Sequence, residues 1–288
     1  MTRAARILAA AVLLAELALA PVPAAAVNCF PVSQVPTGKS FAAARAPLIR
    51  ADFQSAQSSA DEMPSLIGRA TVELTYLGHS SFLIRTPRNV TAITDYNGMN
   101  RAPVTPEIVT MNRAHTSHYT DFVEPGVAHV LRGWATPPEG YPRHDLRVRD
   151  LRVRNVATNI RGFGGGTEFA GNSIFIFETA DFCIAHFGHL HHELDSARRG
   201  RMGQIDVAMV PVDGGLTLPQ QEMAEAVLAL APRMVVPMHA FGAWSLARFA
   251  ELLQSKGYRI VRADGPRFTV TRAALKTRSV LLFPEHLY

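Results

Sequence analysis

The alternation of short apolar runs with amphipathic segments in residues 172–257 constrains the fold more than any other feature. The runs "IDVAMVPV" (205–212) and "RMVVPMHA" (233–240) are short and rich in valine, which is typical of strands buried inside a sheet. Before them, "NSIFIFETADFCIAHF" (172–187) predicts a hairpin of two apolar strands. Each run is followed by a segment with helical spacing, one started by Pro219 and the other closed by Gly257. The pattern predicts an α/β fold of strands flanked by helices.

Residues 71–159 add further strand patterns. "TVELTYLGHSSFLIRT" reads as two short strands with a Gly-His turn, and "VTAITDY" and "EIVTMN" as single strands. "HDLRVRDLRVRNVATN" alternates Leu and Val with Arg and Asp, which predicts a half-exposed strand pair. With no internal repeat, we expect one domain over residues 71–272, followed by a C-terminal tail over 273–288.

The N-terminus has the pattern of a secretory signal peptide. Arg3 and Arg6 precede an apolar stretch from residue 7 to 20, and small residues end at Ala26. The stretch is interrupted by Glu16 and falls short of the roughly 20 residues that span a bilayer. We therefore expect cleavage of residues 1–26, no stable membrane insertion afterwards, and a periplasmic or secreted protein. Residues 27–70 are expected to form an N-terminal extension with one helix.

The two cysteines, Cys29 and Cys183, also bear on the compartment in which the protein folds. An oxidising compartment permits a disulfide between them, but Cys183 lies in an apolar strand pattern where a buried thiol is equally natural. The sequence leaves both possibilities open, because it cannot test the geometry that the bond requires.

The charge distribution argues against a nucleic-acid partner. The formal net charge is +5, but the 29 Lys and Arg residues are spread along the chain without a basic run. This indicates at most a mild bias toward anionic small molecules, so we expect a small-molecule substrate.

Histidines collect where the predicted strands end. Of eleven, five lie at or just past the C-terminal end of an apolar strand, where α/β folds assemble their sites. These five are His115, His118, His186, His189 and His239. Imidazole is a frequent zinc ligand, and three or four converging ligands make a site.

The motifs "LTYLGHSSFLI", "TDY", "VPVDGGLTL" and "PMHA" occur here in an order that resembles the metallo-β-lactamase-fold hydrolases, specifically proteins similar to ascorbate-6-phosphate lactonases. The likeness covers roughly residues 71–245. It implies a four-layer αβ/βα sandwich with a metal site at one edge of the sheets.

The chain departs from that family where metal ligands are expected. In place of "THxHxDH" it has "TMNRAHTSHYTD". Alignment on Thr110 places Met111 and Arg113 at the first two histidine positions and His115 at the aspartate position. Alignment on the following loop favours His115, His118 and Asp121 instead. The resemblance further places Asn159 at a lone histidine and His189 at a metal-bridging aspartate, while His239 is retained.

These departures predict that one half of a two-metal centre is lost. We expect one ion, zinc or another divalent transition metal, held by His115, His118, His189 and His239. Around it we expect His186 and His191, and beneath it His79 and Asp95, which bind each other or the backbone. Arg113 and Asn159 occupy the altered half, and Asp121 or Asp213 is the expected proton acceptor, although Asp213 could instead orient a histidine or form a turn.

The sequence therefore predicts an exported metal-dependent hydrolase of a small, possibly anionic ester, lactone or phosphodiester. The metal would activate a water molecule. The alternative is a non-catalytic ligand- or metal-binding protein on the same fold, favoured by the altered ligand set.

Overall fold

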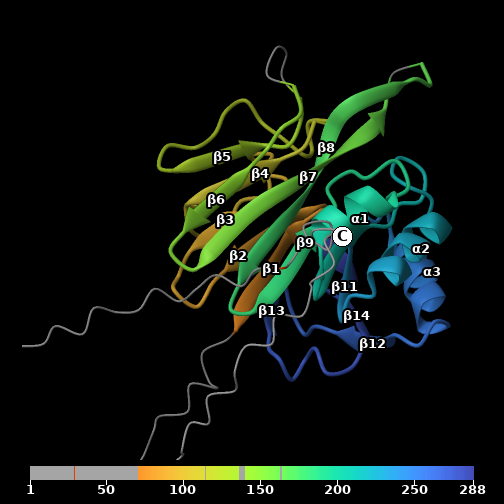
Figure 1. Ribbon diagram of the computed structural model, residues 1–288. Helices are drawn as coiled ribbons and strands as arrows, with labels where there is room; N and C mark the ends of the chain where they lie inside the picture. The colour runs from red at the N-terminus through yellow and green to blue at the C-terminus, as the bar shows by residue number, and fades with distance from the viewer. Residues whose placement is uncertain (1–28, 30–70, 114, 136–139, 163) are drawn as a thin grey trace, which may run out of the picture.

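The computed structural model describes residue 29 and residues 71–113, 115–135, 140–162 and 164–288. The expected signal peptide, and the N-terminal extension apart from Cys29, lie outside the described residues. Two β-sheets stack face to face, and three α-helices lie on the outer side of one of them (Figure 1). The stacked sheets confirm the predicted α/β sandwich, but within the described residues α-helices cover only the eight-stranded sheet, so the expected fourth layer is made by loops there.

The first sheet is formed mainly by the strand patterns of residues 71–132. It has six strands, and β3, β4 and β5 run parallel to one another. In spatial order they are β13 (Arg267–Val270), β1 (Val72–Gly78), β2 (Ser81–Arg85), β3 (Thr91–Ile93), β4 (Ile108–Met111) and β5 (His129–Arg132).

The second sheet has eight strands, and its half nearest the helices is parallel. In spatial order they are β12 (Arg259–Arg262), β14 (Ser279–Leu282), β11 (Met234–Met238), β10 (Val207–Pro211), β9 (Phe182–His186), β8 (Thr167–Thr179), β7 (Leu151–Arg161) and β6 (Asp145–Val148). The helices are α1 (Ser196–Met202), α2 (Gln220–Leu230) and α3 (Ala243–Gln254), with a 3₁₀ turn η3 (Glu285–Leu287). The predicted hairpin, strand pair and two helices are all confirmed.

Apolar side chains fill the space between the layers. One cluster, which includes Phe82 and Phe175, lies between the two sheets. A second, which includes Phe249 and Val235, lies between the eight-stranded sheet and the helices. The outer face of the six-stranded sheet is covered by the loops around it, for example by Tyr96. The residues that follow β4, β9, β10 and β11 lie at one edge of the sandwich.

The expected boundary at residue 272 needs correction. Residues 279–282 form β14, which lies inside the eight-stranded sheet between β11 and β12. Phe283 is buried in the core between the sheets, and its N–H donates to the Tyr288 hydroxyl at 3.2 Å. Residues 273–288 are therefore part of the domain and not a tail, because the apolar run "SVLLF" is needed to fill the sheet.

Cys29 and Cys183 form a disulfide with their Cα atoms 6.0 Å apart. The buried guanidinium of Arg154 holds the same region: it donates to the backbone oxygens of Cys29 at 3.4 Å and Met202 at 2.6 Å, and to the Glu178 carboxylate at 2.6 Å. The disulfide that the sequence left undecided is thus formed, and it links residue 29 to β9. Within the described part of the chain, no helix is long and apolar enough to cross a bilayer.

Candidate metal centre

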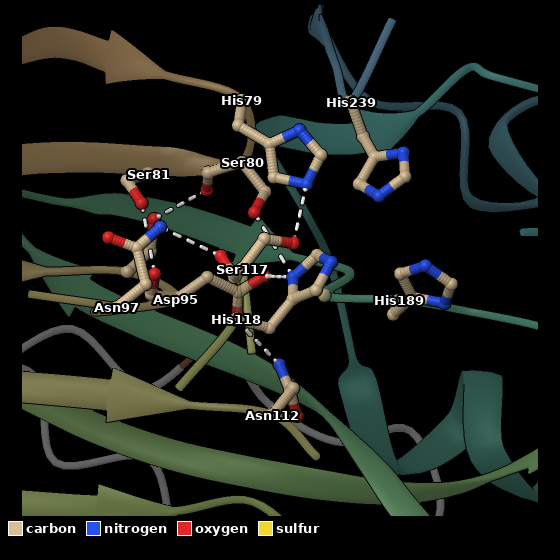
Figure 2. Close-up of polar contacts among 12 residues, drawn as sticks. His79, Ser80, Ser81, Asp95, Asn97, Asn112, Ser117, His118, His189 and His239 are labelled. Atoms are coloured by element: carbon tan, nitrogen blue, oxygen red, sulfur yellow. Dashed lines mark hydrogen bonds and ion pairs between the residues drawn. The ribbon is translucent and has the colours of Figure 1, made fainter. Parts of the chain in front are cut away.

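Four histidines converge at the edge where β4, β9, β10 and β11 end. One ring nitrogen from each of His115, His118, His189 and His239 lies within 4.8 Å of the others. His115 and His118 follow β4 of the six-stranded sheet, whereas His189 follows β9 and His239 follows β11 of the eight-stranded sheet. The cluster therefore lies between the two sheets, with two members from each side, and Figure 2 shows His118, His189 and His239 turned toward one another.

His118 is held by a carboxylate. Its Nδ1 lies 2.6 Å from Oδ2 of Asp95, and the Asn112 amide donates to Oδ1 of the same carboxylate at 2.9 Å (Figure 2). Because the carboxylate accepts the Nδ1 proton, the lone pair of His118 is on Nε2. That Nε2 is buried and has no hydrogen-bond partner among the described residues.

His239 is placed by two contacts. Its Nδ1 lies 3.1 Å from Oδ1 of Asp213, and its backbone N–H donates to the carbonyl oxygen of His79 at 2.7 Å. Asp213 also accepts hydrogen bonds from the backbone N–H groups of Gly215 at 2.9 Å and Leu216 at 2.5 Å. Within the described structure, both ring nitrogens of His239 are buried without a hydrogen-bond partner, and Nδ1 lies only at ion-pair distance from Asp213.

His189 is held through its ring and through its backbone. Its Nδ1 contacts Nε2 of His191, and its backbone N–H donates to the Asn172 side chain at 2.8 Å. His191 in turn accepts the backbone N–H of Arg161 at Nδ1, 2.7 Å away. The backbone turns sharply at Gly188, just before His189, where φ is +58°. A Cβ at this position would lie within 2.4 Å of the Asn112 and Asn172 side chains. Only glycine fits this turn.

His115 is the least buried of the four. Its Nε2 lies 3.0 Å from Nε2 of His189, and its Nδ1 lies 2.7 Å from the Ser117 hydroxyl. The same hydroxyl lies 2.9 Å from Nε2 of His79, so Ser117 bridges the two imidazoles. The His79 ring is close to the cluster, with its centroid 4.1 Å from that of His239.

The surroundings keep these groups in the protonation state that metal binding needs. Burial, followed by the neighbouring imidazoles, lowers the pKa of His115 to about 4 and that of His79 to about 3. Burial raises the pKa of Asp95, but the contacts with His118 outweigh it and lower that pKa to about 2. At neutral pH His115 and His79 are therefore neutral and Asp95 is ionised, so each of these two rings has a lone pair to offer.

The comparison with known proteins follows from this geometry. Residues 73–239 match the family described as Beta-lactamase superfamily domain, which covers more than half of the chain. The chain belongs to this superfamily. The matched residues run from β1 to His239 and so contain the whole histidine cluster.

Relatives in the superfamily have been named as enzymes. A protein of Methanosarcina barkeri named metal-dependent hydrolase is 24% identical over 190 residues, which are 58% of this chain and 83% of the relative. A protein of Thermococcus kodakarensis with the same name is 26% identical over 193 residues, 60% of this chain and 86% of the relative. The prediction of a metal-dependent hydrolase of the metallo-β-lactamase superfamily is confirmed at this level; the narrower likeness to ascorbate-6-phosphate lactonases stays a prediction.

Solved structures share the fold. A Thermotoga maritima structure described as a zinc-dependent hydrolase of the metallo-β-lactamase superfamily superposes with a TM-score of 0.55, at 23% identity, covering 74% of this chain and 98% of that one. A metal-dependent hydrolase structure from Parabacteroides distasonis gives 0.52 at 14% identity, covering 65% of this chain and 90% of that one. At these identities the likeness establishes the sandwich alone.

The structure also places the residues expected in the altered half of the superfamily site. Met111 is buried in the apolar cluster outside the six-stranded sheet, and Arg113 is exposed. Asn159 accepts the backbone N–H of Ala170 at 3.1 Å, so it serves the β7–β8 hairpin. Arg113 and Asn159 are therefore not among the four grouped ligands.

The structure bears on the expectations for three further positions or pairs. Asp121 is exposed and lies outside the four-histidine group, so it is poorly placed to accept a proton there. Asp213 is fully engaged by His239 and by its own turn, which makes it an orienting residue. His79 and Asp95 do not bind each other, because Asp95 pairs with His118 and His79 with Ser117.

His186 and His191 support the cluster without joining it. His186 is fully buried and its Nε2 lies 2.8 Å from the backbone oxygen of Ser80, while its Nδ1 accepts the N–H of Gly188. The residues that sequence reasoning missed are Ser117, Asn112 and Asn172. Only Ser117 carried a signal, since it stands between two of the histidines.

Proposed function

We propose that this protein is an exported hydrolase that uses one zinc ion bound by His115, His118, His189 and His239. The observation that carries the proposal is the pair of buried Nε2 atoms of His118 and His239, which have no hydrogen-bond partner within the described structure. Burying an unpartnered polar atom costs free energy. A bound cation accepts both lone pairs and removes that cost.

The chain's own residues prepare the ligands. Asp95 contacts Nδ1 of His118 at 2.6 Å, which fixes that ring and makes its Nε2 the stronger donor. Asp213 lies 3.1 Å from Nδ1 of His239 on the other side of the cluster. On His115, the Nδ1–H can donate to the Ser117 oxygen while the Ser117 O–H donates to His79. That arrangement leaves the His115 Nε2 lone pair directed into the cluster.

The reaction proposed for the site is hydrolysis of an ester, a lactone or a phosphodiester. Zinc, when bound, supplies positive charge that polarises a substrate oxygen and lowers the pKa of a water molecule. For an ester, the water oxygen adds to the acyl carbon, the ester C–O bond breaks, and the leaving alkoxide takes a proton. The half-buried His115 and His79 lie on the side from which a substrate can approach.

Export is supported by two independent features. The first 26 residues have the composition of a signal peptide. The Cys29–Cys183 disulfide favours an oxidising compartment, because such bonds rarely persist in a reducing cytosol. We therefore propose a periplasmic or secreted location.

A second candidate is a binding protein that holds the ion without catalysis. The four grouped ligands number as many as a closed structural zinc site uses, whereas catalytic sites keep a position for water. This observation favours the alternative, and turnover decides between the two.

The deciding experiment is elemental analysis of protein purified without chelator. We expect about one zinc per chain in the wild type and loss of the metal in His118→Ala and His239→Ala. His144→Ala is the matched control, because His144 contacts the Arg132 backbone away from the cluster. Two ions per chain would contradict the single site, and no metal after zinc is supplied would contradict the metal site. One zinc without turnover of ester, lactone and phosphodiester substrates would favour the binding protein.

A further inference from the structure

Large apolar side chains are exposed around the histidines. Met99, Leu216, Phe241 and Trp244 are 69%, 54%, 61% and 73% exposed, and we call these four residues the apolar rim. They come from the loop after β3, the loop after β10, the loop after β11 and the first turn of α3. Soluble proteins rarely leave such residues grouped at a surface unless something binds there.

Two of the four are linked to the cluster, Phe241 by ring contacts and Leu216 through Asp213. The ring of Phe241 lies 5.2 Å from that of His239 and 6.2 Å from that of His79, measured between centroids. The backbone of Leu216 donates to Asp213, which orients His239. A ligand that reaches the histidines from this side therefore touches Phe241.

Met99 comes from the loop after β3, a strand of the six-stranded sheet. Its backbone N–H donates to Asn97 at 2.9 Å, and the Asn97 amide donates to the backbone oxygen of Ser117 at 2.8 Å. Ser117 is the residue that bridges His79 and His115. The backbone of Met99 is thus linked through Asn97 to the side of the cluster that the six-stranded sheet contributes.

The loops that carry Leu216 and Phe241 are neighbours. β10 and β11 run parallel with Pro211 opposite Met238, so the loops after them leave the sheet side by side. The Gln220 amide joins them by donating to the backbone oxygens of Val212 at 2.6 Å and Ser245 at 2.8 Å. The end of β10 is consequently joined to the start of α3, which follows the loop that carries Phe241.

We propose that the substrate of this site carries an apolar chain or ring, which lies on the apolar rim while its hydrolysable group reaches the four histidines. This rests on the hydrolase function proposed above. It adds an apolar portion to the small, possibly anionic substrate expected from the sequence, because the exposed side chains of the rim offer apolar contact area. Sites of this kind combine an apolar lining with a few polar groups that fix orientation.

The first test measures binding without turnover. Acetate, butyrate and octanoate are titrated calorimetrically into the full protein, once supplied with zinc and once treated with chelator. We expect affinity to rise with chain length, by up to roughly fourfold for each methylene group that becomes buried. The increase with length should persist without metal, since it comes from the rim. Equal affinities for all three acids would overturn the proposal.

Variants localise the effect. Phe241→Ser and Leu216→Ser should flatten the dependence on chain length while acetate affinity and zinc content stay unchanged. Tyr141→Ser is the matched control, because Tyr141 is also exposed but lines a separate hollow with Arg132 and Trp134. Equal losses for acetate and octanoate in Phe241→Ser would overturn the proposal, since the residue would then act by positioning the histidines.

Trp244 supplies a direct signal. The chain has two tryptophans, so Trp134→Phe leaves Trp244 as the one reporter, and octanoate should shift its emission to shorter wavelength whereas acetate should not. Cosedimentation with phosphatidylglycerol vesicles combined with no chain-length dependence would overturn the proposal in favour of a membrane contact. Ester hydrolysis without chain-length dependence would refute the rim alone, and chain-length dependence without hydrolysis would refute the enzyme alone.

Discussion

The backbone N–H of His239 donates a hydrogen bond to the carbonyl oxygen of His79, with 2.7 Å between the two atoms. His239 follows a strand of one sheet and His79 lies in the turn between two strands of the other, so this bond joins the sheets at the metal centre. Both residues have positive φ, 53° and 55°. Residues other than glycine rarely adopt a positive φ, because it strains the backbone. Its presence at both positions indicates that the surrounding structure holds the two backbones so that the rings face the cluster.

Metal removal should destabilise the whole domain, because the four proposed ligands come two from each sheet. We expect saturating zinc, at about one hundred times its dissociation constant, to stabilise the fold by about 2.7 kcal/mol. Thermal unfolding with zinc and with chelator measures this difference. In His239→Ala the two melting curves should coincide, and a zinc-dependent shift in that variant would contradict the ligand assignment.

Asp95→Asn should weaken zinc binding by roughly 10- to 100-fold, because the neutral amide no longer holds His118 in the tautomer that presents Nε2. Competition with a chromogenic chelator gives the affinity. Asp150→Asn is the control: Asp150 accepts from the Thr86 hydroxyl at 2.7 Å and the Arg88 backbone at 2.9 Å, far from the cluster. That change should lower stability and leave zinc affinity as it was. Equal zinc affinity in Asp95→Asn and wild type would refute the orienting role.

Gly188→Ala should abolish metal binding more completely than it lowers stability. The added methyl group meets the Asn172 oxygen that holds the His189 backbone, so His189 must move. Gly257→Ala is a matched control, because Gly257 also has positive φ, +89°, but has nothing within 4 Å of the added carbon. Zinc content and melting temperature of both variants separate the clash from backbone strain. Retention of zinc in Gly188→Ala would show that the turn is less tightly packed than described.

Lowering the pH should destabilise the metal-free protein at pH values well above those at which carboxylates titrate. Unfolded imidazoles take up protons near pH 6.5, whereas burial lowers the folded-state pKa of His115 to about 4 and of His79 to about 3. The unfolded chain therefore binds more protons in that window, and the free energy of unfolding falls as pH decreases from about 6.5 to 4. Urea denaturation at pH 7.5, 6 and 5 tests the slope. His115→Gln should make it shallower; constant stability across the three values would contradict the neutral cluster.

Local sequence patterns were sufficient for most of the architecture. The Val-rich runs around Val210 and Val236 became adjacent parallel strands, and Pro219 is the N-cap of α2. The histidines at strand ends converged as expected, since parallel strands bring their carboxyl ends to the same edge. These features depend on periodicity and on chain order, and both can be read from the residues.

The contacts that the sequence left undetermined or assigned wrongly are all long-range. Asp95 pairs with His118, 23 residues away, and the sequence offered no reason to prefer it over His79. Met111 stands at a histidine position of the family, and the pleat of β4 directs it into the apolar cluster, a contact that the alignment does not reveal. These contacts depend on which face of a strand a residue occupies once the sheets are stacked.

The position of β14 has a consequence for how the domain is made. This strand is the last in chain order, yet it lies between β11 and β12, and β13 borders the other sheet. Neither sheet can be complete until the last quarter of the domain has been synthesised, because pairings of high sequence separation form only when both partners exist. If the protein is exported as proposed, a chain that is incomplete in this way would stay unfolded during translocation, and the sandwich and its histidine cluster would form together afterwards.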